Sequence, residues 1–203
     1  MKATNKTFQM AMTIMVTTLI LIGCKKDDVP LVSGSFNGRI TATVENDAPG
    51  VGLVVAWNET EIQGGTLYGE QASDPVSYNG SSFTLNLPAT PPAGCTFVTI
   101  KSAFEDDLGV SGAKYSNPNV RIMGIDILGW NSAGNTMYGF FVHITSDEKM
   151  QCVYLYAEDD VTVRGGSNLS VSFKEGWNRL YISDNLVTTK EQSNLKWYFS
   201  ELE

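Results

Sequence analysis

Short runs of alternating apolar and polar residues fill the chain after its N-terminal segment, and Gly, Asn, Asp and Pro residues separate these runs. In residues 35–45, for example, Phe36, Ile40 and Val44 share one side of an extended chain, and polar residues occupy the other side. A period of two is typical of strands, and no long stretch carries the period of a helix. The pattern therefore predicts an all-β protein.

About ten strands, separated by turns every ~8–12 residues, are typical of sandwiches and barrels. We expect the strands at residues 35–45, 51–57, 82–87, 96–103, 120–128, 136–145, 150–157, 161–164, 169–173, 177–182 and 195–200, and the longest loop at residues 105–119. No linker divides the chain. The predicted fold is therefore a single antiparallel β-sandwich at residues 34–203, with a closed β-barrel as the alternative.

The N-terminal segment has a different pattern, in which two lysines precede an uncharged and largely apolar run at residues 8–22. This run is shorter than the roughly 20 residues that a membrane-spanning helix needs, and it fits a secretory signal better. It ends in Leu-Ile-Gly-Cys at residues 21–24, which resembles the cleavage box of bacterial lipoproteins. The resemblance implies a signal peptide at residues 1–23, cleavage between Gly23 and Cys24, and attachment of acyl chains to the Cys24 thiol.

Residues 24–33 are expected to tether the domain to a membrane. Two or three acyl chains on Cys24 would anchor the protein stably, because each buried methylene contributes ~0.8 kcal/mol. Lys26, Asp27 and Asp28 follow the cysteine and resemble the surface-export signal of Bacteroidota lipoproteins. We therefore expect a lipid-anchored protein in the outer membrane of a Gram-negative bacterium, facing the cell surface, with the periplasmic side as the alternative.

Composition narrows the set of partners. With 14 Lys and Arg, 22 Asp and Glu and a formal net charge of −8, the chain lacks the basic face that neutralises nucleic-acid phosphates, and we expect no nucleic-acid partner. An acidic body does not lie flat on anionic lipid, so the anchor must hold it at the membrane. A single His also excludes metal sites built from several histidines, and we expect no metal and no cofactor.

Four segments from residue 78 onward carry a further resemblance. They are residues 78–88 (YNGSSFTLNLP), 153–165 (VYLYAEDDVTVRG), 174–181 (KEGWNRLY) and 195–199 (LKWYF). Together with the signal, they resemble an uncharacterised family of small all-β outer-membrane lipoproteins of Bacteroidota. The resemblance implies an all-β fold and a lipid anchor but no catalytic residue, and Glu158 stands where the pattern of the family has Asp.

His143 is the single His, so a Ser-His-Asp triad would have to include it. By alternation it shares a strand face with Phe141 and Thr145, and the chain has no Gly-x-Ser-x-Gly elbow to supply a nucleophile. We therefore expect a surface or half-buried His rather than a catalytic one.

Acidic residues cluster at residues 105–107, 147–148 and 158–160. We expect solvated turns there, since none of the three matches a calcium-binding loop. Two carboxylates ~5–10 Å apart across a cleft would instead suit an enzyme acting on envelope polysaccharide, which is the alternative to a non-enzymatic function.

Aromatic residues at strand ends and turns are the better indication of function. The candidate ligand-binding residues are Trp57, Tyr68, Trp130 and Tyr138, because exposed aromatic rings stack on the apolar faces of sugars. Packing in the core or at a sheet edge is the alternative for these side chains. The leading hypothesis is therefore a non-enzymatic binding module for a glycan or for a protein partner in the envelope.

Four further residues concern the core. Trp177 and Trp197 lie in alternating runs and are expected to be buried. Cys95 and Cys152 remain after lipidation, and an oxidising compartment permits a disulfide between them, with two buried free thiols as the alternative.

A third functional hypothesis is a structural subunit that pairs through an exposed strand edge at residues 197–199.

Overall fold

The structure is a computed structural model that describes residues 31–63, 66–166 and 168–202. The predicted signal peptide, the lipidation site at Cys24 and most of the tether lie outside these ranges. No helix within them is both long and apolar enough to cross a membrane.

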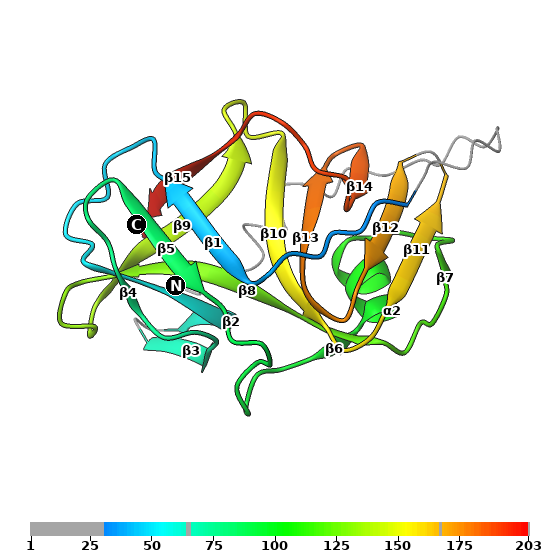
Figure 1. The fold of residues 1–203 in the computed structure, drawn as a ribbon, viewed down its shortest axis with the longest axis horizontal. Helices are drawn as coiled ribbons and strands as arrows, with labels where there is room; N and C mark the ends of the chain where they lie inside the picture. Colours follow the sequence, from blue (N-terminus) through cyan, green and yellow to red (C-terminus); the bar gives the residue numbers. More distant parts are fainter. Residues whose placement is uncertain (1–30, 64–65, 167, 203) are drawn as a thin grey trace.

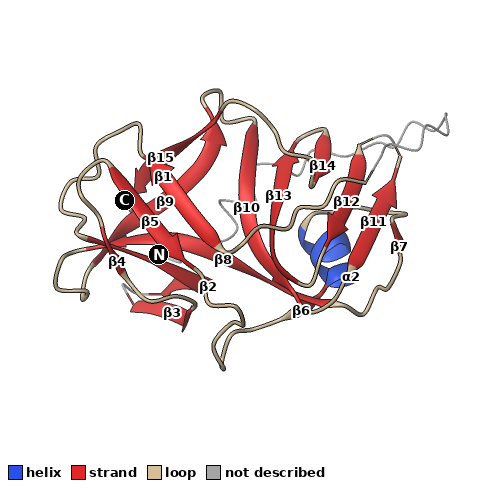
Figure 2. Cartoon of the chain, in the orientation of Figure 1, coloured by secondary structure: helices blue, strands red, loops and turns tan. Residues whose placement is uncertain are grey.

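The described residues form fifteen strands and one short helical segment (Figures 1 and 2). The elements are β1 (Arg39–Thr43), β2 (Leu53–Gln63), β3 (Thr66–Gln71), β4 (Val76–Ser77), β5 (Ser82–Asn86), β6 (Val98–Thr99), α2 (Ile100–Ser102), the π-helix η1 (Ala103–Asp107), β7 (Lys114–Tyr115), β8 (Arg121–Trp130), β9 (Met137–Thr145), β10 (Met150–Ala157), β11 (Val161–Gly165), β12 (Leu169–Phe173), β13 (Gly176–Ser183), β14 (Leu186–Thr188) and β15 (Leu195–Glu201).

One large sheet runs in the order β3-β2-β8-β9-β10-β13-β14-β12-β11-β7, with β15 paired to β9. β1 and β5 pair with each other and cross in front of this sheet as a second layer (Figure 1). The prediction of an all-β, sandwich-like fold is confirmed. No pairing among the described strands joins the two ends of the order, so the sheet does not close into a barrel.

Three details differ from the prediction. The strands outnumber the expected ten because β3, β4, β7 and β14 are short or irregular and their sequences do not alternate clearly. The sheet is mixed rather than antiparallel, since β12 and β14 run parallel. Residues 96–103 were expected to form one strand, but only Val98–Thr99 does so.

The chain turns into a helix directly after β6. The Thr99 hydroxyl accepts a hydrogen bond from the backbone N–H of Ser102 at 3.2 Å and so caps α2. Ile100 and Phe104 are almost fully buried against β11, β12 and β13. The segment is too short for its apolar residues to show a helical period, which is why the sequence did not indicate it.

The core has two parts. The first lies between the β1–β5 layer and the large sheet, and the second lies between α2–η1 and the far end of the sheet. Trp177 and Trp197 belong to the first part and are 5% and 6% exposed, which confirms the prediction that they are buried. Trp197 packs edge-on against Phe83 of β5, so this aromatic contact joins the two layers.

The free edge of β15 is covered by the chain itself. Val44 forms a parallel bridge with Trp197, and the Asn46 side chain both donates to the Phe199 carbonyl at 2.8 Å and accepts from the Phe199 N–H at 2.7 Å. These bonds occupy the backbone groups that an added strand would need.

Candidate functional site

Three of the four predicted aromatic residues lie together on the outside of the large sheet. The rings of Trp57 on β2 and Trp130 on β8 are 5.9 Å apart, and the Trp57 indole donates to the Tyr68 carbonyl at 3.3 Å. Tyr68 is 49% exposed, whereas the two tryptophans are half-buried and pack on each other. We call Trp57, Tyr68 and Trp130 the tryptophan surface.

Tyr138 follows Met137, which pairs with Trp130 across β8 and β9, but no ring contact joins Tyr138 to the tryptophan surface. Tyr138 is half-buried against the first part of the core, and its ring covers Gly50, where a Cβ would come within 2.8 Å of the ring. The structure therefore gives Tyr138 a packing environment and does not join it to the other three candidates.

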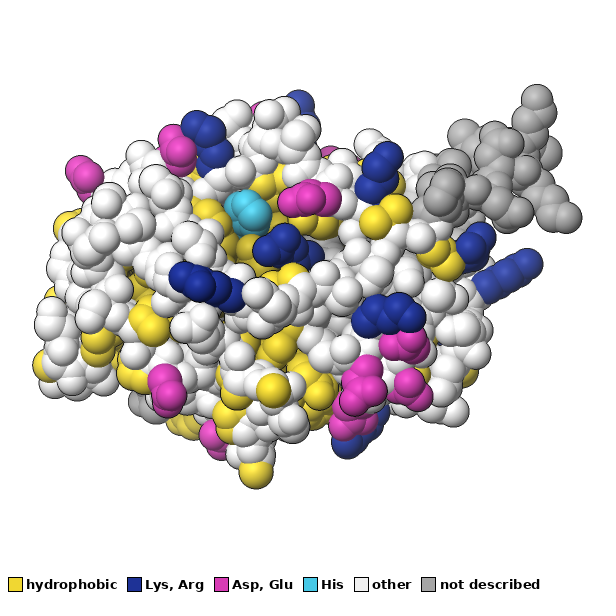
Figure 3. All heavy atoms as spheres, viewed as in Figure 1, with side chains coloured by type: hydrophobic (Ala, Val, Ile, Leu, Met, Phe, Trp, Pro, Cys, Tyr) yellow, Lys and Arg dark blue, Asp and Glu magenta, His cyan; other side chains and the backbone are white. Residues whose placement is uncertain are grey.

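A groove that the sequence did not indicate lies under β1. Its volume is about 330 Å³, and its lining comprises Ile40, Thr41, His143, Tyr154, Arg179, Tyr181, Glu191, Gln192, Asn194, Leu195 and Trp197. Figure 3 shows the histidine, in cyan, next to a basic and an acidic side chain on a hollowed part of this face. We call this cavity the groove.

Strand register brings the floor of the groove together from four strands. His143 of β9 lies opposite Trp197 of β15, and Tyr154 of β10 lies opposite Arg179 of β13. Because side chains directly opposite each other point to the same face of a sheet, residues far apart in the sequence form one row.

The floor is a layered set of flat groups. The His143 ring stacks on Trp197 at 4.7 Å with an interplanar angle of 2°, and Tyr154 lies parallel to Trp197 at 5.9 Å. His143 Nδ1 is 3.1 Å from the Tyr154 hydroxyl, and the imidazole also hydrogen-bonds the backbone of Leu195. His143 is half-buried, as expected, but these contacts hold its ring in place.

His143 is neutral at pH 7. Burial is the main reason that its pKa is lowered to about 4, and the nearby positive charge of Arg179 lowers it further. The neighbouring hydroxyls are neutral as well, since burial raises the pKa of Tyr181 to about 12 and also raises the pKa of Tyr154.

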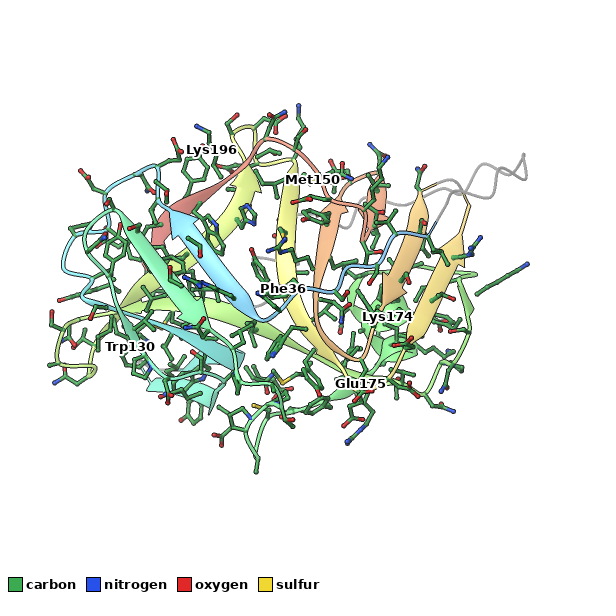
Figure 4. All side chains as sticks on the ribbon, in the orientation of Figure 1. Phe36, Trp130, Met150, Lys174, Glu175 and Lys196 are labelled. Atoms are coloured by element: carbon green, nitrogen blue, oxygen red, sulfur yellow. The ribbon has the colours of Figure 1, made fainter. Side chains whose placement is uncertain are left out.

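Arg179 is the charged group of the groove floor. It is half-buried, and its guanidinium lies 4.8 Å from the centroid of the Phe36 ring, which comes from the segment before β1 (Figure 4). It hydrogen-bonds the Tyr181 hydroxyl, but its Nε is buried and has no hydrogen-bond partner. None of the described carboxylates forms an ion pair with it.

A second cavity of about 510 Å³ is lined by residues of β8 and β10 and of the segment before β6, and we call it the proline pocket. Its lining comprises residues 90–95, Phe97, Arg121, Tyr156 and Glu158. Arg121 lies 5.2 Å from the Phe97 centroid and binds Glu158 through two hydrogen bonds, one of them from Nε to Oε2 at 2.7 Å. Its charge is therefore neutralised within the chain.

The acidic clusters stay separate in the structure. Residues 105–107 lie on η1, residues 147–148 on the turn between β9 and β10, and residues 158–160 on the turn between β10 and β11. No group of three His, Cys, Asp or Glu suited to a metal ion occurs in the part of the chain that the structure describes. Cys95 and Cys152 are free thiols, at the proline pocket and beneath the groove respectively.

Comparison of the chain with models of protein families, with curated proteins and with solved structures finds no match in any of the three.

Proposed function

We propose that this protein is a lipoprotein of the outer membrane, anchored through Cys24, and that it acts as a non-enzymatic binding module for a glycan. The groove is the observation that carries the binding function. Its volume of about 330 Å³ lies at the lower end of the range of small-molecule sites, ~300–1,000 Å³, and suits one or two sugar units.

The chemistry of the groove is suited to a sugar. A sugar presents hydroxyls at its rim and apolar C–H groups on its faces. Thr41, Gln192 and Asn194 supply polar groups at the mouth of the groove, and Leu195 and Ile40 supply apolar contacts. The neutral state of His143 leaves no second charge on the floor beside Arg179.

The anchor is proposed from the sequence, on the Leu-Ile-Gly-Cys motif at residues 21–24 and the short apolar run before it. Replacement of Cys24 by Ser should release the protein from the membrane fraction and remove the mass of the acyl chains. Protease added to intact cells should digest the wild-type protein if it faces the cell surface. A Cys24→Ser protein that stays in the membrane fraction would contradict the proposal.

Binding can be tested by closing the groove. Thr41 lines the mouth of the groove and is exposed, so Thr41→Trp should fill the mouth without disturbing the core. Thr84 is directly opposite Thr41 on β5 but does not line the groove, so Thr84→Trp is the matched control. On a glycan array, Thr41→Trp should lose the glycans that wild type and Thr84→Trp retain.

The tryptophan surface is the rival place for a glycan, because the exposed Tyr68 accepts a hydrogen bond through its carbonyl from Trp57, and Trp57 packs on Trp130. A Tyr68→Ala and Trp130→Ala double variant tests it. If the double variant lost binding while Thr41→Trp kept it, the glycan would bind at the tryptophan surface and not in the groove. Failure of the wild-type protein to bind any glycan would overturn the proposed function.

The two other hypotheses find less support among the described residues. Glu191 is the one carboxylate in the lining of the groove, so a facing pair for acid–base catalysis is not present there. A strand added beside residues 197–199 would have to displace Val44 and Asn46.

A further inference from the structure

The electrostatic state of Arg179 is unusual for this chain. Among the described residues, the basic side chains of Lys101, Arg121, Lys149, Lys174 and Lys196 form ion pairs with carboxylates, and all of these side chains are exposed to solvent. Arg179 is half-buried and has no such partner among the described residues. This is unusual, because a charged side chain that is removed from water is normally paired with an opposite charge.

The surroundings hold the guanidinium in place without neutralising it. Phe36 lies against its face at 4.8 Å, and the Tyr181 hydroxyl hydrogen-bonds it. Both contacts fix the orientation of a planar cation, and neither supplies negative charge. The Nε hydrogen is buried and still lacks an acceptor.

From this arrangement we infer that the glycan bound in the groove carries a carboxylate, as uronic acids do, and that this carboxylate pairs with Arg179. The inference rests on the proposed function and specifies its ligand. A guanidinium matches a carboxylate through two parallel N–H to oxygen bonds, which its planar fork of five N–H donors can supply.

The charges of the other groups around Arg179 favour a ligand with a single negative charge next to this arginine. His143 is neutral, so it adds no positive charge for a phosphate dianion. Glu191 lines the same groove and repels additional negative charge. The net charge of −8 likewise disfavours a densely charged polymer. Tyr154, Tyr181 and Cys152 are kept neutral by burial.

The test uses the full chain, purified from membranes in detergent, on an array that prints each uronic-acid glycan beside its methyl ester. The ester keeps the sugar skeleton and removes only the charge. Wild type should bind the free acids roughly tenfold or more tightly than the esters, which is the usual range for a hydrogen bond to a charged group. Because this comparison uses the wild-type protein, it does not depend on the folding of a variant.

Arg179→Gln should abolish the preference for the free acid, and Arg179→Lys should restore only part of it, because Lys keeps the charge but not the fork. Arg121→Gln is the matched control, since Arg121 also lies over a Phe ring but is paired with Glu158. It should keep the full preference. Retention of the preference in Arg179→Gln would overturn the inference.

His143 locates the bound acid, because the chain has a single His and its imidazole signals in NMR report on the groove alone. A free acid bound beside Arg179 should shift these signals and raise the pKa of His143. An acid that binds without moving them would bind elsewhere and overturn the inference. Equal binding of acids and esters would also overturn it and leave the proposed function standing, whereas binding of no glycan at all would overturn both.

Discussion

Arg121 and Arg179 each lie over a phenylalanine ring at a cavity, but only Arg121 is paired with one of the described carboxylates. Each guanidinium lies over a phenylalanine ring, at 5.2 Å for Phe97 and 4.8 Å for Phe36, and each lines a cavity. Glu158 neutralises Arg121, whereas Arg179 has no carboxylate partner among the described residues. The two sites therefore share their aromatic support and differ in charge compensation.

The difference shows why we propose the smaller of the two cavities as the binding site. The proline pocket is the larger of the two, at about 510 Å³ against 330 Å³. Its arginine, however, already has the interaction that a ligand would offer, and a ligand would have to break it. The groove is smaller, but its arginine has no ion-pair partner among the described residues, so a ligand can supply a negative charge without breaking an existing pair.

The largest expected difference between the two cavities is in stability. Trp197 forms the floor of the groove and is 6% exposed, so Trp197→Ala should lower the free energy of unfolding by about 3–5 kcal/mol. Phe97 is a half-buried wall of the proline pocket, and Phe97→Ala should cost roughly half as much or less. Urea unfolding followed by circular dichroism measures both, and equal losses would contradict the distinction.

The next effect is a pH dependence that only the groove should show. The pKa of His143 is lowered to about 4 in the folded protein from 6.5, so the unfolded chain binds more protons between these pH values. Stability should fall as the pH decreases from 6.5 to 4, by on the order of 3 kcal/mol from this residue. His143→Gln should remove this part of the slope. The carboxylates titrate in both proteins and cancel in the difference, so parallel curves would refute the assignment.

A smaller effect is electrostatic and separates the two arginines directly. Arg179 is the second cause of the low pKa of His143, after burial. Arg179→Met removes the charge, so an NMR titration should find the pKa of His143 above its wild-type value. Arg121→Met should leave it unchanged, since Arg121 lines the other cavity. The same pKa in both variants would mean that burial alone sets it.

The smallest effect comes from an attempt to make the proline pocket resemble the groove. Glu158→Gln leaves Arg121 over Phe97 without its carboxylate. In an Arg179→Gln background, this change should create only weak binding of galacturonate, roughly millimolar, because Arg121 is exposed and water screens its charge. Calorimetry measures it, and affinity equal to that of the groove would show that burial of the arginine does not matter.

Much of the fold could be predicted from alternation alone. The predicted strands at residues 150–157 and 169–173 have the bounds of β10 and β12, and Trp177 and Trp197 are buried as expected. The prediction failed at residues 96–103, because a capped helix as short as α2 leaves no period in the sequence. It also missed β14, which has three residues and pairs on both sides.

The candidate site could be predicted only in part. Trp57, Tyr68 and Trp130 come together because β2 pairs with both β3 and β8, and aromatic type alone indicated them. Arg179 was not singled out, because in the sequence it looks like an ordinary solvent-facing residue of a strand. Only the structure shows that β13 is covered on both faces and that Arg179 is half-buried. Nothing in the residues around Arg179 indicates whether a carboxylate lies within reach of it.

The sequence by itself determined most of the strands and the residues that are buried in them, because these depend on local pattern. The lipid anchor at Cys24 stays a prediction from the same local pattern. Only the tertiary structure decided that His143, Tyr154, Arg179 and Trp197 form one floor, since strand register sets which side chains are neighbours. It also decided which arginine is paired. A charge is compensated by an opposite charge within a few ångströms in space, and the separation of two residues along the chain does not determine their distance in space.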